Sequence, residues 1–247
     1  MAVPVLIPFY KDQRQLDLCL AALAKQDSPV EVRVHDNSVE NLYYTIALNH
    51  GLKKAILEEH EFAILLNQDC YLRPDAVRRM LEFMKSQPRC ALAGIKQVLA
   101  ANQDQIIHGG CTVAYPAGRH HSGLKSRGDC SVNKKMPWIN GACMIARLDA
   151  VIEFGLMDQN MKMIGSDSDW CFTARARGWE VWYCADAEAA HEVGVSGRQP
   201  SMEMQKIFRA DMDYWRDKWI GSALYTRLSW EFDPPQPMTQ SGVMAVK

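Results

Sequence analysis

The N-terminal part of the chain alternates short apolar runs with segments in which leucines recur every three or four positions. Short apolar runs bounded by turn-forming residues predict buried strands, and the leucine spacing predicts helices with one apolar face. This alternation predicts an α/β fold built on a Rossmann-like, doubly wound and mostly parallel sheet. The predicted elements are a strand at 3–7, a helix at 16–23, a strand at 30–34, a helix at 41–55 and a strand at 62–66.

The pattern continues to about residue 200, where we place the end of the main domain, 1–200. Residues 70–75 predict a loop, and the polar, glycine-containing stretch at 100–135 predicts irregular structure. The remaining predicted elements are helices at 74–86, from Leu148 and at 171–177, and strands at 90–94, 143–146 and 180–183.

An amphipathic helix is predicted between residues 204 and 232, because Phe208, Met212, Trp215 and Trp219 recur at steps of three and four. Such a face usually packs against a core, and the interleaved arginines and lysines also suit an anionic membrane surface. We therefore expect a C-terminal helical extension over 201–232, whose apolar face contacts either the core or a membrane surface. The Pro-rich, then small and polar tail at 233–247 predicts disorder.

Composition and charge are ordinary for a globular protein: 48% of the 247 residues are hydrophobic, and the formal net charge is −1. With no long basic run to attract a phosphate backbone, nucleic acid is not an expected partner. A signal-peptide pattern and an apolar run of membrane-spanning length are both absent. We expect a cytoplasmic protein, with peripheral contact at the inner face of the membrane as the alternative. The eight scattered cysteines predict reduced, packed thiols.

Two acids end predicted strands, Asp36 after the second and Asp69 after the third. Strand ends gather at one edge of an open α/β sheet, and ligands bind there. Neither a G-x-G-x-x-G pattern after the first strand nor a P-loop is present to cradle phosphates. Carboxylates hold a diphosphate through a bridging divalent cation, which favours Asp69 as a metal ligand. The alternative is that Asp69 caps a turn or helix.

Further candidates for chemistry lie later in the chain. Asp167 and Asp169 fall at the predicted start of a helix, where capping and the helix dipole give acids a structural explanation. His120 and His121 are candidate metal ligands, although adjacent residues seldom point the same way.

In their order and spacing, these segments resemble the family 2 glycosyltransferases of the GT-A fold, with the bacterial rhamnosyltransferase-like members closest in pattern. The resemblance covers residues 3 to 196 and rests on segments 3–10, 34–38, 65–69, 138–142 and 166–169, and on His191. It implies inverting transfer of a sugar from a nucleotide-diphosphate sugar to a hydroxyl acceptor, with Mg²⁺ or Mn²⁺. It also implies a role in bacterial cell-surface polysaccharide or glycoconjugate synthesis, the acceptor being a glycan, a lipid-linked glycan or a protein.

The resemblance implies a role for each matching residue. Asp167 would be the catalytic base, Asp69 and His191 would bind the metal, and Asp36 would accept a hydrogen bond from the nucleobase or ribose. The implied donor-binding residues are Pro8, Phe9, Tyr10, Asp36, Asn67, Gln68, Asp69, Asn140, Gly141 and Ala142. The candidates for the loop or the acceptor side are Trp138, Asp169 and Trp170.

Two positions depart from the family pattern. Asn67 stands where the first acid of Asp-x-Asp is expected, which leaves fewer charges for a metal, and Ser166 replaces the usual Glu beside the base. These departures motivate one alternative, a catalytically inactive GT-A module that acts as a binding or scaffold subunit. A second alternative, a sugar nucleotidyltransferase, is disfavoured because segment 8–12 has no glycine for a triphosphate-binding loop.

Overall fold

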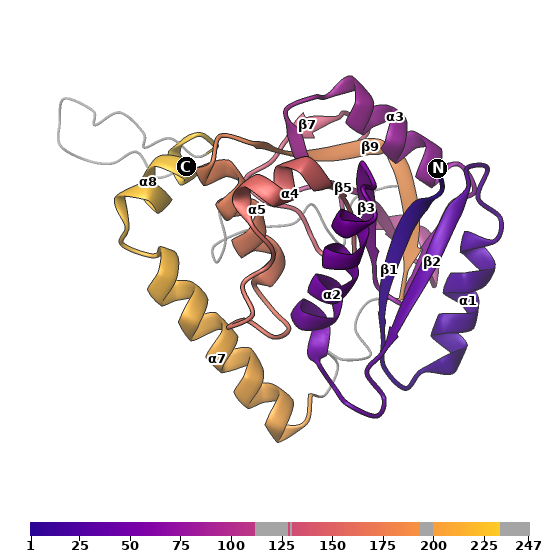
Figure 1. Cartoon of the computed structure of the whole chain (residues 1–247), viewed down its shortest axis with the longest axis horizontal. Helices are drawn as coiled ribbons and strands as arrows, with labels where there is room; N and C mark the ends of the chain where they lie inside the picture. The colour runs from indigo at the N-terminus through magenta and orange to yellow at the C-terminus, as the bar shows by residue number, and fades with distance from the viewer. Residues whose placement is uncertain (112–127, 129, 193–199, 233–247) are drawn as a thin grey trace.

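The computed structural model describes residues 1–111, 128, 130–192 and 200–232, and it is built around a mixed sheet flanked by helices (Figure 1). The principal strand order is β2-β1-β3-β8-β5-β9-β4, with β6 paired to β5 and β7 to β9. The strands are β1 (Val3–Phe9), β2 (Val30–Asp36), β3 (Phe62–Leu66), β4 (Cys70–Leu72), β5 (Cys90–Leu99), β6 (Asn102–His108), β7 (Lys134–Lys135), β8 (Cys143–Arg147) and β9 (Glu180–His191). The helices are α1 (Gln13–Leu23), α2 (Tyr43–Leu57), α3 (Ala76–Ser86), α4 (Leu148–Phe154), α5 (Ser166–Ala176), α7 (Met202–Trp219) and α8 (Ala223–Trp230).

The first three long strands form the parallel unit that the sequence predicts. β1 pairs in parallel with β2 on one side and with β3 on the other, so their C-terminal ends share one edge. β8 then lies between β3 and β5 and is antiparallel to both, whereas β5 and β9 are parallel. The expected α/β class is therefore confirmed, with an antiparallel strand between its two parallel parts.

Several strands extend into segments for which the sequence predicts loops. Residues Cys70–Leu72 pair with the end of β9, and Asn102–His108 pair with β5, so both loop predictions were wrong at these positions. β9 continues to His191 after a register shift against β5. Its last part carries small and charged residues, which satisfy backbone pairing without the apolar pattern by which strands are predicted.

Side chains on the two faces of the sheet enter two separate apolar cores. In β1, Val5 and Ile7 belong to the core that includes residues of α1 and α3, whereas Leu6 belongs to the core that includes residues of α2, α4, α5 and α7. This is the alternation expected of a strand that is buried on both faces. α2 packs against β1, β2 and β3, and it lies beside β1 in the view of Figure 1.

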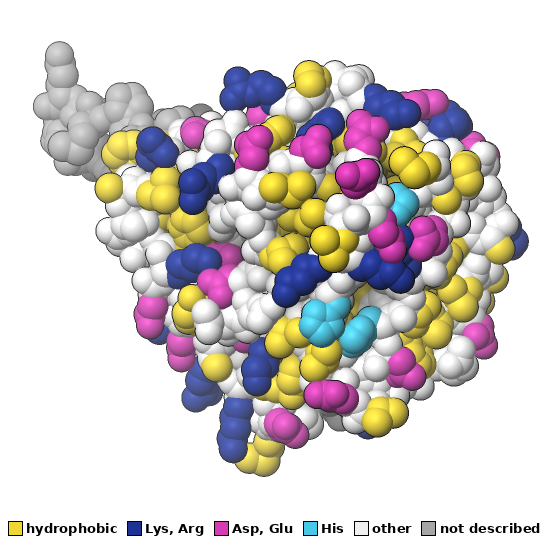
Figure 2. Space-filling view, in the orientation of Figure 1, with side chains coloured by type: hydrophobic (Ala, Val, Ile, Leu, Met, Phe, Trp, Pro, Cys, Tyr) yellow, Lys and Arg dark blue, Asp and Glu magenta, His cyan; other side chains and the backbone are white. Residues whose placement is uncertain are grey.

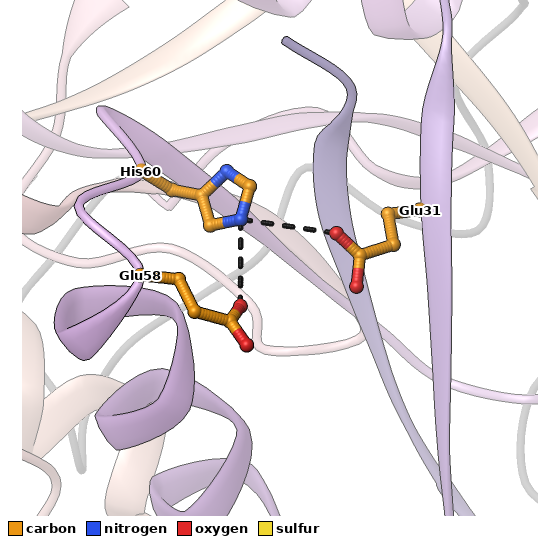
Figure 3. Close-up of side chains that lie close together, drawn as sticks. All are labelled: Glu31, Glu58 and His60. Atoms are coloured by element: carbon orange, nitrogen blue, oxygen red, sulfur yellow. Dashed lines mark ion pairs between the residues drawn. The ribbon is translucent and has the colours of Figure 1, made fainter.

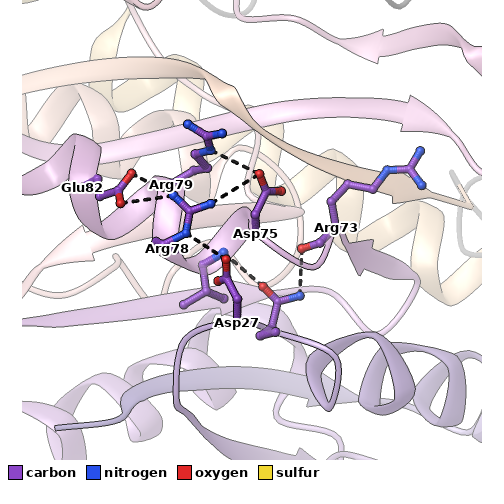
Figure 4. A network of polar contacts seen from close by, with 8 residues as sticks. Asp27, Arg73, Asp75, Arg78, Arg79 and Glu82 are labelled. Atoms are coloured by element: carbon purple, nitrogen blue, oxygen red, sulfur yellow. Dashed lines mark hydrogen bonds and ion pairs between the residues drawn. The ribbon is translucent and has the colours of Figure 1, made fainter.

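A polar network joins the turn after α1 to the start of α3 (Figure 4). Arg78 pairs with Asp27 at 2.8 Å, and Gln26 accepts the Val77 N–H while its amide donates to the Arg73 carbonyl at 2.8 Å. Exposed ion pairs of this kind contribute about 0–1 kcal/mol each. Gln26 satisfies a backbone N–H at the start of α3, so it does more to hold the turn after α1 against that helix.

Residues 202–230 form two helices where one was predicted. Gly221 adopts a positive φ of 82°, and the chain turns there between α7 and α8. The predicted aromatic face packs inward: Trp215 and Trp219 are 0% and 4% exposed and contact Phe172 of α5. These tryptophans are therefore committed to the core, and contact with a membrane would need other residues. In the described part of the chain, no helix combines the length and apolar character needed to cross a bilayer.

Asp211 of α7 holds the loop that precedes α5. Its carboxylate is 2% exposed and accepts the backbone N–H groups of three consecutive residues at 2.8 to 3.0 Å. The donors are Lys162, Met163 and Ile164. Because a buried charge must be hydrogen-bonded to be tolerated, this contact fixes α7 and the loop relative to each other.

We expect Asp211→Ala to lower the free energy of unfolding by about 3 kcal/mol, because three buried N–H groups lose an acceptor worth about 1 kcal/mol each. Urea unfolding followed by circular dichroism measures this difference. The matched control is Asp213→Ala, which removes a half-exposed acid on the same helix and should stay within about 0.5 kcal/mol of the unmodified chain. Equal urea midpoints for the two variants would contradict the proposed role of Asp211 in holding the loop.

Candidate active site

A cavity of about 450 Å³ lies at the C-terminal ends of β1 and β3. Its floor comes from the residues that follow the two strands, and its sides come from α2 and from the start of α7. An open α/β sheet binds ligands at this edge, because the strand ends there present loops and unpaired backbone groups. The lining includes Pro8, Tyr10, Lys11, Asn37, Tyr43, Tyr44, Asn67, Gln68, Asp69, Met163, Ser201 and Met204.

Five of the predicted donor-binding residues meet at this cavity: Pro8, Tyr10, Asn67, Gln68 and Asp69. The Gln68 side chain joins the two strand ends, since its Oε1 accepts the Tyr10 N–H at 2.6 Å and its Nε2 donates to Gln15 at 3.1 Å. Gln68 therefore shapes the cavity floor by holding the end of β1 against the end of β3.

Asp36 and Phe9 lie beside the cavity without lining it. The Asp36 side chain is exposed at the end of β2, and its Oδ1 accepts the Ser38 N–H at 2.7 Å. Hydrogen bonds from the Ser38 hydroxyl first, and then from the Ser38 N–H, lower the pKa of Asp36. Its neighbour Asn37 reaches the cavity instead, while the Phe9 ring is in the core and its carbonyl accepts the Asn37 N–H. The contact of Asp36 with a nucleobase or ribose stays a prediction.

Asp69 and His191 come together through the pairing of β4 with β9, in which Cys70 lies opposite His191. His191 Nε2 is 3.3 Å from Asp69 Oδ1, and both side chains are mostly buried. On its other side, His191 Nδ1 is 2.9 Å from Gln97 Oε1. The contact is an ion pair when the imidazole carries both protons, and the two side chains can ligate one cation when it carries a single proton on Nδ1.

The side chains of Asp69 and His191 together offer ligand atoms that suit a divalent cation. A carboxylate oxygen and an imidazole nitrogen face each other, and the second ring nitrogen is hydrogen-bonded as in most histidine metal ligands. A cation held by two protein groups keeps open positions, which phosphate oxygens and water can fill. Asn67 also lines the cavity and adds a neutral amide where an acid was expected.

Glu192, which sequence reasoning missed, anchors the chain beside this pair. Its carboxylate binds the Arg14 guanidinium in a bidentate contact at 2.6 and 2.9 Å, and this hydrogen bond is the main reason its pKa falls to about 2. Its backbone N–H donates to the Asp69 carbonyl at 2.9 Å. The ion pair thus ties the end of β9 to α1, and only the fold brings Arg14 and Glu192 together.

Asp167, the predicted base, lies against the 138–142 loop at the start of α5. Its Oδ2 accepts the Gly141 N–H at 2.8 Å, and its Oδ1 accepts the Ser168 N–H at 2.8 Å. A Cβ added to Gly141 would lie 2.4 Å from the Tyr44 hydroxyl oxygen and 3.0 Å from Asp167 Cβ, so only glycine permits this approach. The Tyr44 hydroxyl donates to the Gly141 carbonyl at 2.8 Å and connects this loop to the cavity wall.

Asp169, a candidate for the loop or the acceptor side, lies inside the protein. It is 1% exposed, accepts a hydrogen bond from Trp219 Nε1 at 2.7 Å and pairs with Lys218 Nζ at 2.8 Å. Burial raises its pKa, and Lys218 opposes that shift. Asp169 therefore attaches α5 to α7 and does not face the cavity.

The other two acceptor-side candidates are also buried. Trp138 is 3% exposed, and Trp170 is 0% exposed with its Nε1 donating to the Gly155 carbonyl. Ala142 is buried, and its backbone carbonyl accepts the Asn67 N–H at 2.8 Å, so the 138–142 loop is bonded directly to the cavity floor. Trp138 therefore anchors the start of the 138–142 loop in the core, whereas Trp170 packs on Phe154 and joins α5 to the end of α4.

A second group of metal-ligating side chains lies near the start of β2 and comprises Glu31, Glu58 and His60 (Figure 3). The mostly buried Arg33 guanidinium contacts both carboxylates, at 2.8 Å to Glu31, and lies 3.2 Å from His60 Nε2. A metal ion would have to displace this guanidinium and leave it without its partners, which is costly. We interpret the group as an ion-pair cluster.

The candidate metal ligands His120 and His121 fall outside the described residues, and His108, which ends β6, is 1% exposed. Acidic and basic side chains are interspersed on the face shown in Figure 2, in keeping with the net charge of −1. This distribution gives the face no broad field of one sign.

Comparisons with known proteins agree with this geometry. Residues 38–210 match the family model described as "Glycosyltransferase like family 2". The chain is similar to glucomannan 4-beta-mannosyltransferase 2 of Arabidopsis thaliana, with 22% identity over 164 residues, which are 66% of this chain and 29% of the plant protein. The chain therefore spans less than a third of the length of this relative.

Two solved structures share the fold. GalNAc-T7, in a structure with UDP, GalNAc and Mn²⁺, superposes with a TM-score of 0.62 and 15% identity over 87% of this chain and 50% of that one. TarS of S. aureus superposes with a TM-score of 0.61 and 16% identity over 98% of this chain and 44% of that one. The expected GT-A fold is confirmed, and the chain belongs to glycosyltransferase family 2.

Proposed function

We propose that this chain is an inverting, metal-dependent glycosyltransferase that moves a sugar from a nucleotide-diphosphate sugar to a hydroxyl acceptor. The observation that carries the proposal is the Asp69–His191 pair at a cavity formed by strand ends. The printed names of the similar proteins support it, since they include a mannosyltransferase and a structure with UDP, GalNAc and Mn²⁺.

The donor binds in the 450 Å³ cavity. The aromatic rings of Tyr10, Tyr43 and Tyr44 offer faces for a nucleoside, and Lys11 supplies a positive charge at the same wall. Asp36 accepts a hydrogen bond from the nucleobase or ribose at the exposed end of β2. A divalent cation, Mg²⁺ or Mn²⁺, held by Asp69 and His191 would supply charge neutralisation for the diphosphate leaving group.

Asp167 is the catalytic base. Its carboxylate takes the proton from the acceptor hydroxyl as that oxygen forms a bond to the anomeric carbon, and the bond from that carbon to the diphosphate oxygen breaks. The attack is on the face opposite the leaving group, so the configuration inverts. Gly141 and Ser168 hold both carboxylate oxygens through one lone pair each, which fixes the position of the base and leaves the second lone pairs available.

The acceptor is a glycan, a lipid-linked glycan or a protein, and we place the reaction in bacterial cell-surface polysaccharide or glycoconjugate synthesis, in the cytoplasm or at the inner face of the membrane. This wider role rests on the resemblance to rhamnosyltransferase-like members. The alternative of a catalytically inactive module still rests on Asn67. This residue replaces the first acid of the Asp-x-Asp motif and leaves Asp69 as its acid. A turnover measurement separates the two.

We expect UDP-, dTDP- or GDP-sugar hydrolysis in the presence of Mn²⁺ or Mg²⁺, and its loss on addition of EDTA. Asp69→Ala should abolish it with little change in the unfolding midpoint, because a ligand is removed from a cavity wall and not from the core. Product analysis by chromatography measures the rate. The control, Asp75→Ala, removes a half-exposed acid that follows β4 and should keep full activity. Hydrolysis that persists in EDTA, or in Asp69→Ala, would exclude the assigned metal site.

We expect Asp167→Asn to lower kcat by about 10² to 10⁴ and to leave donor affinity nearly unchanged, because an amide cannot accept the proton. Since both Asp167 oxygens accept N–H groups, the amide also loses one of these bonds, and a thermal melt must accompany the kinetics. The control is Asp149→Asn, an exposed acid in the first turn of α4. Normal turnover in Asp167→Asn, or a product with retained configuration by NMR, would refute the assignment.

A further inference from the structure

Gln97 of β5 bridges the two parts of the active site. Its side chain is buried, with the residue 1% exposed, and it contacts His191 at the end of β9 and Asn140 in the 138–142 loop. The distances are 2.9 Å from Oε1 to His191 Nδ1 and 3.3 Å from Nε2 to Asn140 Oδ1. A buried amide with both ends engaged fixes the orientation of its two partners.

The direction of each hydrogen bond follows from a backbone donor at one end of this series of hydrogen-bonded groups. The Ala142 N–H donates to Asn140 Oδ1 at 2.8 Å, so that atom is an oxygen and accepts. Gln97 therefore donates through Nε2 and turns Oε1 towards the imidazole. An oxygen acceptor at Nδ1 requires the proton of a neutral His191 to be on Nδ1, which leaves the Nε2 lone pair directed at the Asp69 side.

We propose that Gln97 is a positioning residue that selects the Nδ1–H tautomer of His191 for cation binding and couples the cation site to the 138–142 loop. The inference rests on the proposed function, because it assumes that Asp69 and His191 hold the cation. Loss of a hydrogen bond to a ligating histidine costs about 10- to 100-fold in metal affinity, so the effect of Gln97 is large enough to measure.

Two substitutions separate the hydrogen bond from the shape of the side chain. Gln97→Met keeps the length and removes both polar ends, whereas Gln97→Glu keeps an oxygen acceptor for His191 Nδ1–H and loses the donor to Asn140. The probe is MnCl₂ alone, with free Mn²⁺ measured by electron paramagnetic resonance. We expect Mn²⁺ affinity to fall about 10- to 100-fold in Gln97→Met and to stay within about threefold of the unmodified chain in Gln97→Glu.

The control is Gln103→Met on the neighbouring strand β6, where the exposed glutamine accepts from Arg73. It should leave Mn²⁺ affinity unchanged. Equal Mn²⁺ affinity in Gln97→Met and the unmodified chain would overturn the inference, as would equal losses in Gln97→Met and Gln97→Glu. If neither Gln97 variant folds, long-range ¹H–¹⁵N NMR of the unmodified chain decides: an Nδ1–H tautomer at His191 supports the proposal, and an Nε2–H tautomer overturns it.

These outcomes are distinct from a failure of the proposed function. If the unmodified chain binds no Mn²⁺ and hydrolyses no sugar nucleotide, the metal-dependent transferase is wrong, and the inference falls with it. If the unmodified chain binds Mn²⁺ and Gln97→Met binds it equally well, the transferase stands and only the positioning role of Gln97 is lost.

Discussion

The pairing of β4 with the end of β9 is the constraint on which the proposed active site depends. It puts Cys70 opposite His191, and the hydrogen bond from Glu192 N–H to the Asp69 carbonyl continues the alignment by one residue. A slip of one residue would turn the imidazole to the other face of the sheet and remove it from Asp69. The bidentate Arg14–Glu192 contact opposes such a slip, because the slip would separate the two charged groups and leave both without partners.

Buried carboxylates attach the C-terminal helix α7 to α5 and to the loop before it. Asp211 accepts three backbone N–H groups of the loop before α5, and Asp169 is neutralised by Lys218 and hydrogen-bonded to Trp219. Each acid would be costly in the core without these partners. The loop that leads to Asp167 is therefore held in place by α7, at residues far from the proposed reaction.

The sequence predicted those parts of the site that depend on local pattern. Asp69 was predicted because it ends an apolar strand, and the parallel order of β1, β2 and β3 followed from the alternation of strands and helices. The partners of these residues could not be predicted in this way. Gln97 and Glu192 lie outside the segments on which the family resemblance rests, and their roles depend on strand extensions that lack an apolar period. The insertion of β8 between β3 and β5 is likewise a property of the assembled sheet.

The 138–142 loop connects both sides of the proposed reaction. Gly141 N–H holds the Asp167 carboxylate, and two residues of the same short loop, Asn140 and Ala142, connect through Gln97 to His191. The Ala142 carbonyl also accepts the Asn67 N–H of the cavity floor. Because transfer requires the base and the leaving-group site to keep one relative position, a loop bonded to both fixes that geometry better than two independent supports. Displacement of this loop would therefore disturb proton removal and departure of the diphosphate together.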